Sequence, residues 1–312
     1  MDIIDIRQVS KRYSNHLALD RVSFSIPQGS VFGLLGPNGA GKTSLIRILT
    51  RITAPDSGEV FFNGHPLADT HMLDMGYLPE ERGLYKKMQV GEQALYLARL
   101  KGLSRHDALQ RLKYWFEKFE IQSWWDKKVE ELSKGMAQKV QFITTVLHDP
   151  SFIILDEPFT GFDPINAELI KNELIGLKNQ GVAIVLSTHR MESVEELCSH
   201  IALINRAKVI LNGSVKDIRS EYRSHSYILD FTGDQGTFNQ AVSSAGEVVS
   251  IHEVDGLNTA VVVLRQEVDT NKFLSLLLPV CQVISFNELI PGISDIFIKK
   301  VSEVTANTEI VS

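Results

Sequence analysis

The sequence predicts an α/β fold built on a parallel sheet, followed by a smaller α+β domain. The apolar runs 31–35, 152–155 and 182–187 are typical of fully buried strands, and segments of helical periodicity separate them. The first run breaks into a glycine-rich loop before a helical pattern begins, which is the strand–loop–helix order of doubly wound folds. After about residue 219 the pattern changes to short strands and short helices, and this change predicts the second domain.

The composition is that of an ordinary globular protein. The 312 residues, 44% hydrophobic and 22% charged, suffice for a full core and for two domains. A formal net charge of -6 argues against a nucleic-acid-binding surface as the main function. The two distant cysteines, Cys198 and Cys281, fit buried thiols in a reducing cytosol better than a disulfide or a zinc site. No run approaches the ~20 apolar residues of a spanning helix, and residues 1–5 are no signal peptide, so we expect a partner to supply any membrane part.

Residues 31–43 predict a phosphate-binding loop. The glycines allow successive N–H groups to point into one concavity, and the following helix adds its positive N-terminal end. We expect Lys42 to reach the β- and γ-phosphates and the Thr43 hydroxyl to ligate Mg²⁺. The spacing G-x-x-x-x-G-K-T in this context disfavours a chance glycine-rich turn. The expected nucleotide-binding residues are Gly36, Pro37, Asn38, Gly39, Ala40, Gly41, Lys42, Thr43 and Ser44.

Tyr13 lies upstream of this loop, in a polar turn between the predicted strands 3–9 and 22–26. Its ring could stack on a purine base, because base–aromatic stacking is favourable and tolerant of sequence. It could equally cap the edge of the sheet. The residues alone leave both interpretations open.

Residues 89–130 are predicted to be helical throughout and to form an insert between strands. Trp124 and Trp125 close this insert. An exposed pair could hold a partner helix, but buried anchoring of the insert is the favoured interpretation. The apolar residues that fall at 3-4-3 spacing are Leu109, Leu112, Phe116 and Phe119.

Two stretches downstream carry further candidates. Ser133 and Gly135 precede a helical pattern, where a serine can simply be the N-cap but can also form a second phosphate clamp. The strand 152–155 runs into Asp156 and Glu157, which places two carboxylates at the ligand-binding edge of the sheet. Asp156 suits Mg²⁺ held through water and Glu157 suits polarisation of an attacking water. The strongly apolar run before them disfavours a pair of solvated turn acids.

His189 follows the third core strand, 182–187. A lone histidine is more often structural, but this strand ends on the same edge as the phosphate loop. We therefore expect His189 to donate a hydrogen bond to a γ-phosphate.

These motifs together resemble those of the ATP-binding subunit of an ABC (ATP-binding cassette) transporter, over roughly residues 1–215. The family's phosphate loop matches residues 36–43, its signature motif residues 132–136, its second acidic motif residues 153–157, and its switch histidine His189. The resemblance implies a P-loop ATPase fold with a helical insert of about 89–147. It also implies ATP and Mg²⁺ as cofactors.

The resemblance further implies that two such domains pack head to tail. ATP on Lys42 and Thr43 of one copy would then be covered by Ser133 and Gly135 of a second copy or of a paralogous ATPase. The resemblance also implies that Tyr13 contacts the adenine, that Asp163 belongs to the loop that crosses the dimer interface, and that Glu157 is the catalytic base.

Two departures from the family pattern concern the same site. Glu80 stands where the family usually has Gln; it can still ligate Mg²⁺, but its charge near the γ-phosphate favours slower or more tightly coupled hydrolysis. Lys134 and Met136 replace the usual Gly and Gln of the signature. Because Ser133 and Gly135 remain, we expect phosphate contact to be kept.

Residues 78–84 and the altered signature resemble the sodium-export (NatA-like) subgroup, whose members pair with separate ABC-2 type permeases. The expected organisation is an ATP-binding domain over 1–218, a small α+β accessory domain over 219–300 without catalytic clusters, and a flexible polar tail over 301–312. Such a subunit would work at the cytoplasmic face of the membrane, with no nucleic acid as partner, although the cargo is not readable.

The alternative is a soluble ABC-type ATPase with a non-membrane partner. The sequence disfavours this alternative, because it has one phosphate loop, no heptad run and no residue spacing typical of a zinc site. A P-loop kinase is disfavoured by the signature stretch.

Overall fold

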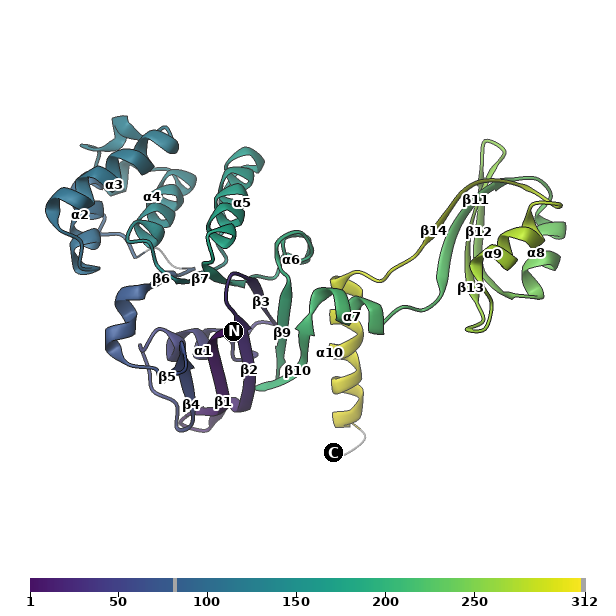
Figure 1. Cartoon of the computed structure of the whole chain (residues 1–312), viewed down its shortest axis with the longest axis horizontal. Coiled ribbons are helices and arrows are strands. Elements are labelled where there is room, and N and C mark those ends of the chain that lie inside the picture. The colour runs from purple at the N-terminus through teal and green to yellow at the C-terminus, as the bar shows by residue number, and fades with distance from the viewer. Residues whose placement is uncertain (81–82, 310–312) are drawn as a thin grey trace. The chain divides into compact units, whose positions relative to one another are not determined.

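The computed structural model describes residues 1–80 and 83–309, and these residues form two compact units. The first unit comprises residues 1–215 together with the chain from residue 303, and the second comprises residues 216–302 (Figure 1). The expected boundary at 218 lies within a few residues of this division.

A six-stranded sheet forms the centre of the first unit. Its order is β10-β9-β3-β8-β7-β6, with all neighbours parallel except the pair β9 and β10. Because β3 pairs with both β8 and β9, the early strand lies in the middle of the sheet. The strands are β3 (Val31–Leu35), β6 (Met75–Leu78), β7 (Phe152–Asp156), β8 (Ala183–Ser187), β9 (His200–Asn205) and β10 (Lys208–Ser214). The helices that connect them include α1 (Lys42–Leu49), α5 (Pro164–Asn179) and α6 (Met191–Leu197). Strands β3, β7 and β8 are buried at every residue, as their apolar runs predict.

A four-stranded antiparallel sheet of order β2-β1-β4-β5 shares one hydrophobic core with the six-stranded sheet and α1. Its strands are β1 (Asp2–Tyr13), β2 (His16–Pro27), β4 (Ser57–Phe62) and β5 (His65–Pro66). The predicted strands 3–9 and 22–26 are present but longer than expected. Tyr13 is therefore the last residue of β1 and pairs with His16 across a short turn.

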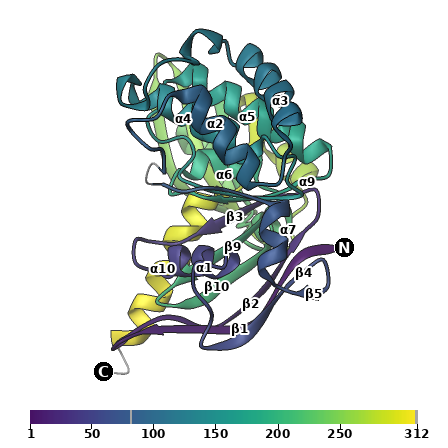
Figure 2. The ribbon, with the colours of Figure 1, turned by 90° about the vertical axis from the view of Figure 1, so that its left-hand side faces the viewer.

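The helical insert contains α2 (Val90–Leu100), α3 (Arg105–Lys118) and α4 (Lys134–Val146), which lie together in both views (Figure 1 and Figure 2). The expectation of helix throughout 89–130 is wrong for the turns that join them, which include the 3₁₀ helices η2 (Gln122–Trp124) and η3 (Val129–Glu131). A further 3₁₀ helix, η1 (Asp69–Asp74), precedes β6. Trp125 is half-buried against Phe116 and Gly91, where an added Cβ would lie 2.3 Å from its ring, so Trp125 anchors the insert.

The second unit contains an antiparallel sheet of order β12-β13-β11-β14, with a core that includes the stacked rings of Phe231 and Phe238. The elements are α7 (Val215–Glu221), β11 (Ser226–Thr232), α8 (Gln235–Ser243), β12 (Gly246–Val254), β13 (Leu257–Leu264), α9 (Thr270–Leu277), β14 (Gln282–Glu288) and the first part of α10 (Ile293–Glu309), whose residues from 303 on belong to the first unit. The tail that we expected to be flexible over 301–312 is helical as far as Glu309, because α10 continues through it; residues 310–312 lie outside the described part.

None of the helices within residues 1–80 and 83–309 is both long enough and apolar enough to cross a membrane.

Candidate nucleotide-binding site

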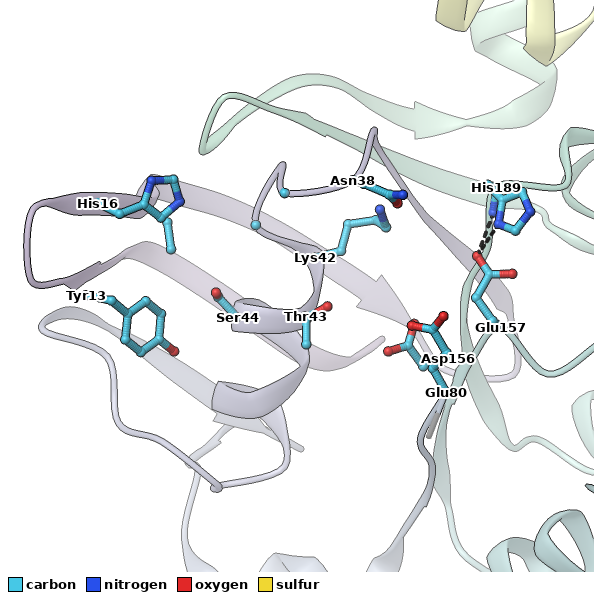
Figure 3. A pocket seen from close by; sticks show the side chains of 13 residues that line it. Tyr13, His16, Asn38, Lys42, Thr43, Ser44, Glu80, Asp156, Glu157 and His189 are labelled. Atoms are coloured by element: carbon cyan, nitrogen blue, oxygen red, sulfur yellow. Dashed lines mark hydrogen bonds and ion pairs between the residues drawn. The ribbon is translucent and has the colours of Figure 1, made fainter. Parts of the chain in front are cut away.

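A cavity of about 280 Å³ lies at the carboxyl edge of the parallel strands (Figure 3). The β1–β2 hairpin, the loop after β3 and the residues that end or follow β6, β7 and β8 meet there. Ligands of doubly wound sheets bind at this edge, because the loops and helix N-termini converge on it. The residues that line the cavity are Tyr13, His16, Ala18, Asn38, Gly39, Gly41, Lys42, Thr43, Ser44, Glu80, Asp156, Glu157 and His189.

The backbone of the glycine-rich loop admits no side chain at Gly41. This residue precedes α1 with φ +120°, and an added Cβ would lie 2.3 Å from the carbonyl oxygen of Ala18. No carboxylate occupies the first turn of α1. No carboxylate of α1 itself therefore competes for the free N–H groups at this helix start, which is the arrangement that binds phosphate.

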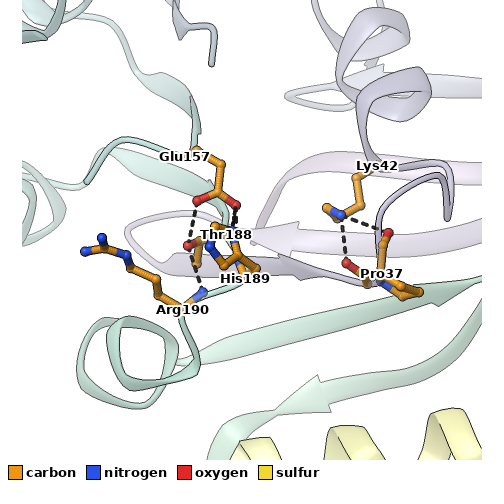
Figure 4. Close-up of polar contacts among 7 residues, drawn as sticks. Pro37, Lys42, Glu157, Thr188, His189 and Arg190 are labelled. Carbon is orange, nitrogen blue, oxygen red and sulfur yellow. Dashed lines mark hydrogen bonds and ion pairs between the residues drawn. The ribbon is translucent and has the colours of Figure 1, made fainter. Parts of the chain in front are cut away.

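Lys42 lies over the loop that precedes it (Figure 4). Its Nζ donates to the carbonyl oxygens of Gly36 at 2.7 Å and of Pro37 at 3.1 Å. Burial lowers the pKa of Lys42, while the charges of Asp156, Glu157 and Glu80 oppose that shift. The Lys42 ammonium group lies near three carboxylates. Together with the positive N-terminal end of α1, it suits a polyanionic ligand.

The carboxylates of Asp156, Glu80 and Glu157 lie together on one side of the cavity (Figure 3). The pKa of Asp156 is raised, chiefly by burial and further by the charges of Glu80 and Glu157. Hydroxyl and carboxylate oxygens are the ligands that Mg²⁺ prefers, and a divalent cation would relieve this repulsion. In the described part of the chain no three His, Cys, Asp or Glu residues form a complete metal cage. The donors present, Thr43, Glu80 and Asp156, therefore fit a cation that phosphate oxygens complete.

Glu157 is held from the neighbouring strand end (Figure 4). Its carboxylate accepts from the backbone N–H of His189 at 2.9 Å and from the Thr188 hydroxyl at 3.2 Å, and it pairs with His189 Nδ1 at 2.7 Å. The backbone of Glu157 adopts φ +51°, a strained conformation for a residue with a side chain. The two candidates for catalysis predicted from the sequence thus form one hydrogen-bonded pair at the cavity wall.

The hairpin supplies the side of the cavity remote from the carboxylates (Figure 3). Tyr13 is 39% exposed there, which leaves its ring accessible for stacking. His16 and Ala18 also line the cavity, and the sequence reasoning missed both. The two-residue turn between Tyr13 and His16 is the signal that could have found His16, because a hairpin places these side chains opposite each other.

Six predicted site residues do not line this cavity. Gly36, Pro37 and Ala40 belong to the phosphate loop itself, whereas the other three lie at the starts of α4 and α5. The Ser133 hydroxyl accepts from the backbone N–H of Met136 at 3.2 Å and caps α4. Asp163 accepts from the backbone N–H of Asn166 at 2.9 Å and caps α5, and these hydrogen bonds lower its pKa. Gly135 lies in the first turn of α4. Within one chain Ser133, Gly135 and Asp163 lie at the starts of helices and outside this cavity.

The parallel sheet, the phosphate loop and the acidic strand end define a P-loop nucleotide-binding ATPase. Within that class the chain belongs to the ABC transporter family, as an ATP-binding subunit that hydrolyses ATP. The family model described as "ABC transporter" matches residues 19–160, and a second, "ATP-binding protein DrrA1-3-like, C-terminal domain", matches residues 213–301.

Relatives of the chain agree with this assignment. It is 46% identical to the uncharacterized ABC transporter ATP-binding protein YhaQ of Bacillus subtilis, over 70% of this chain and 74% of that protein. It is 38% identical to the Nod factor export ATP-binding protein I of Burkholderia pseudomallei, over 68% and 70%. A solved ATP-binding subunit of an ABC transporter superposes with a TM-score of 0.66 at 30% identity, over 70% of this chain and 93% of that one.

Proposed function

We propose that this subunit powers an exporter by pairing with a separate ABC-2 type permease at the cytoplasmic face of the membrane. The observation that carries the ATPase part is the meeting of Lys42, Asp156 and Glu157 in one cavity. Export is supported by the similarity to the Nod factor export ATP-binding protein I. Membership of the sodium-export (NatA-like) subgroup remains part of this proposal, and the cargo is left open.

Within one chain, we assign the residues that face the cavity to the reaction. The loop from Gly36 to Gly41 and the N–H groups of Lys42, Thr43 and Ser44 hold the phosphates, and Tyr13 stacks on the adenine. Thr43, Glu80 and Asp156 would hold Mg²⁺, which neutralises phosphate charge when bound.

Glu157 polarises the attacking water, because its carboxylate already faces the cavity and is oriented by Thr188 and His189. His189 can exchange its pairing with Glu157 for a hydrogen bond to the γ-phosphate, since its side chain is 73% exposed. Positioning and charge stabilisation, with water as the acceptor, account for the chemistry.

A second copy, or a paralogous ATPase, would complete the site. Ser133, Gly135 and Asp163 lie at helix N-termini outside the cavity, so they can contact the nucleotide only of another chain. ATP binding would close this dimer and hydrolysis would reopen it. The helical insert and the Glu80 loop would pass the motion to the permease.

Affinity purification from detergent-solubilised membranes tests the proposal. The Glu157→Gln variant in Mg-ATP should hold the closed dimer and retain a stoichiometric polytopic membrane protein. Lys42→Ala, which removes the phosphate contact, is the matched control and should recover less of it. Recovery of soluble partners alone, such as ribosomes, would refute the proposal that the partner is a membrane permease. It would favour a soluble ABC-type ATPase.

A further inference from the structure

Strand β6 is an edge of the six-stranded sheet, since β7 is its one paired neighbour in the described part of the chain. An edge strand exposes backbone groups that something else must cover. Here the helical insert covers them. Helix α4 approaches β6 so closely that a Cβ added at Gly76 would lie 2.6 Å from the carbonyl oxygen of Thr145.

One main-chain carbonyl of β6, that of Met75, accepts hydrogen bonds from two side chains of the helical insert. Met75 O accepts from Lys101 Nζ at 2.7 Å and from His148 Nε2 at 3.1 Å. Lys101 is the residue that caps the C-terminus of α2, and His148 follows α4. The same Lys101 Nζ also donates to Met72 O at 2.6 Å. We call Lys101, His148 and the carbonyl of Met75 the Met75 clasp.

Lys101 carries the charge in the Met75 clasp. Burial lowers its pKa, which the nearby charge of Asp74 opposes. Burial, reinforced by the Lys101 charge, lowers the pKa of His148 to about 4, so His148 is neutral at physiological pH. Hydrogen bonds from a charged donor are about twice as strong as neutral ones. Removing the ammonium group therefore removes the main attachment of the insert to Met75.

The strand that is held in this way leads directly into the nucleotide cavity. β6 ends at Leu78, Pro79 fixes the next backbone turn, and Glu80 lines the cavity. We propose that Lys101 is a positioning residue, which acts through β6 to fix the Glu80 carboxylate beside Asp156. This proposal rests on the proposed ATPase function, because one of its two expected consequences is a change in the rate of ATP hydrolysis.

The test compares Lys101→Met, Lys101→Arg and the control Lys113→Met in the full-length chain. Lys113 lies on α3 with a side chain that is 78% exposed, so its loss changes charge without touching β6. Hydrogen–deuterium exchange of residues 75–80 is measured together with kcat and KM for Mg-ATP. Lys101→Met should speed exchange in this segment at least tenfold and lower kcat at least fivefold. KM should stay within twofold, because the phosphate loop is not part of the Met75 clasp.

Lys101→Arg should restore both readouts to within twofold of wild type, because a guanidinium can donate to the same carbonyls. Unchanged exchange in Lys101→Met, or faster exchange with unchanged kcat, would overturn the proposal. If Lys101→Met does not fold, His148→Gln weakens the same carbonyl contact and should shift both readouts in the same direction, by less. A wild-type chain without ATPase activity would refute the proposed function, while the exchange of residues 75–80 would still decide whether Lys101 holds β6.

Discussion

Two glycines of the phosphate loop provide a matched pair for testing how the nucleotide is held. Gly41 has φ +120°, and an added Cβ would lie 2.3 Å from the Ala18 carbonyl oxygen and 2.9 Å from Leu19. Gly39 has φ +77°, and an added Cβ would meet nothing within 4 Å. Because real Cβ atoms essentially never approach closer than 3.0 Å, Gly41→Ala must displace the start of α1 or the facing backbone at Ala18, and both line the cavity.

A misplacement of about 1 Å can cost an enzyme about 100-fold in rate, and we take the same order of magnitude for the loss of the phosphate-binding geometry. We therefore expect Gly41→Ala to weaken ATP binding at least ~100-fold, which corresponds to about 2.7 kcal/mol. Gly39→Ala incurs the cost of a left-handed alanine, about 1 kcal/mol, so its affinity should fall no more than about fivefold. Fluorescent-nucleotide titration of both variants gives the affinities, and circular dichroism verifies that each remains folded. Equal affinities for the two folded variants would refute this account of the loop.

Three other predictions concern side chains. Glu157→Gln should lower kcat about 10²–10⁴-fold while ATP still binds. The amide can accept the hydrogen bond from the His189 N–H, but it cannot serve as a base. A loss of kcat below tenfold in a steady-state phosphate-release assay would contradict this prediction. Lowering the pH from 6.5 to 4 should destabilise the fold by up to roughly 3 kcal/mol through His148, since the unfolded chain binds its proton over that window and the folded chain does not. Thermal melting of His148→Gln should show a smaller acid sensitivity than wild type, and an equal sensitivity would count against the buried neutral imidazole. Cys198, whose pKa burial raises to about 12, should resist alkylation at pH 8 until the chain unfolds, and rapid labelling of the native protein, followed by mass spectrometry, would show otherwise.

The presence of the core strands and the location of the cavity could be predicted because they depend on local sequence, whereas the order of the strands in the sheet was not predicted. Apolar runs that end in Asp156 and His189 reveal both a buried strand and the edge where it stops. The Met75 clasp leaves no such trace. Its donors are an isolated lysine and an isolated histidine. Its acceptor is a backbone carbonyl, which every residue type carries and which therefore gives no signal in the sequence.

Ser133 and Asp163 show a different limit of sequence reasoning. An N-cap and a phosphate clamp require the same residue type at the same position, because both satisfy free N–H groups of a first helical turn. The structure displays the cap for each of them. The phosphate clamp expected of Ser133 and the interface role implied for Asp163 both depend on another chain, so both remain predictions.

The central position of β3 has a consequence for biosynthesis. This strand carries the phosphate loop, yet both of its hydrogen-bonding neighbours, β8 and β9, begin at residues 183 and 200. At ribosomal rates of about 5–20 residues per second, β3 waits roughly 7–30 seconds before either neighbour is made. During that interval both hydrogen-bonding edges of β3 are without native partners, although its side chains can already pack on β2 and α1. The nucleotide cavity is therefore assembled late in synthesis, although its best-known motif is made among the first fifty residues.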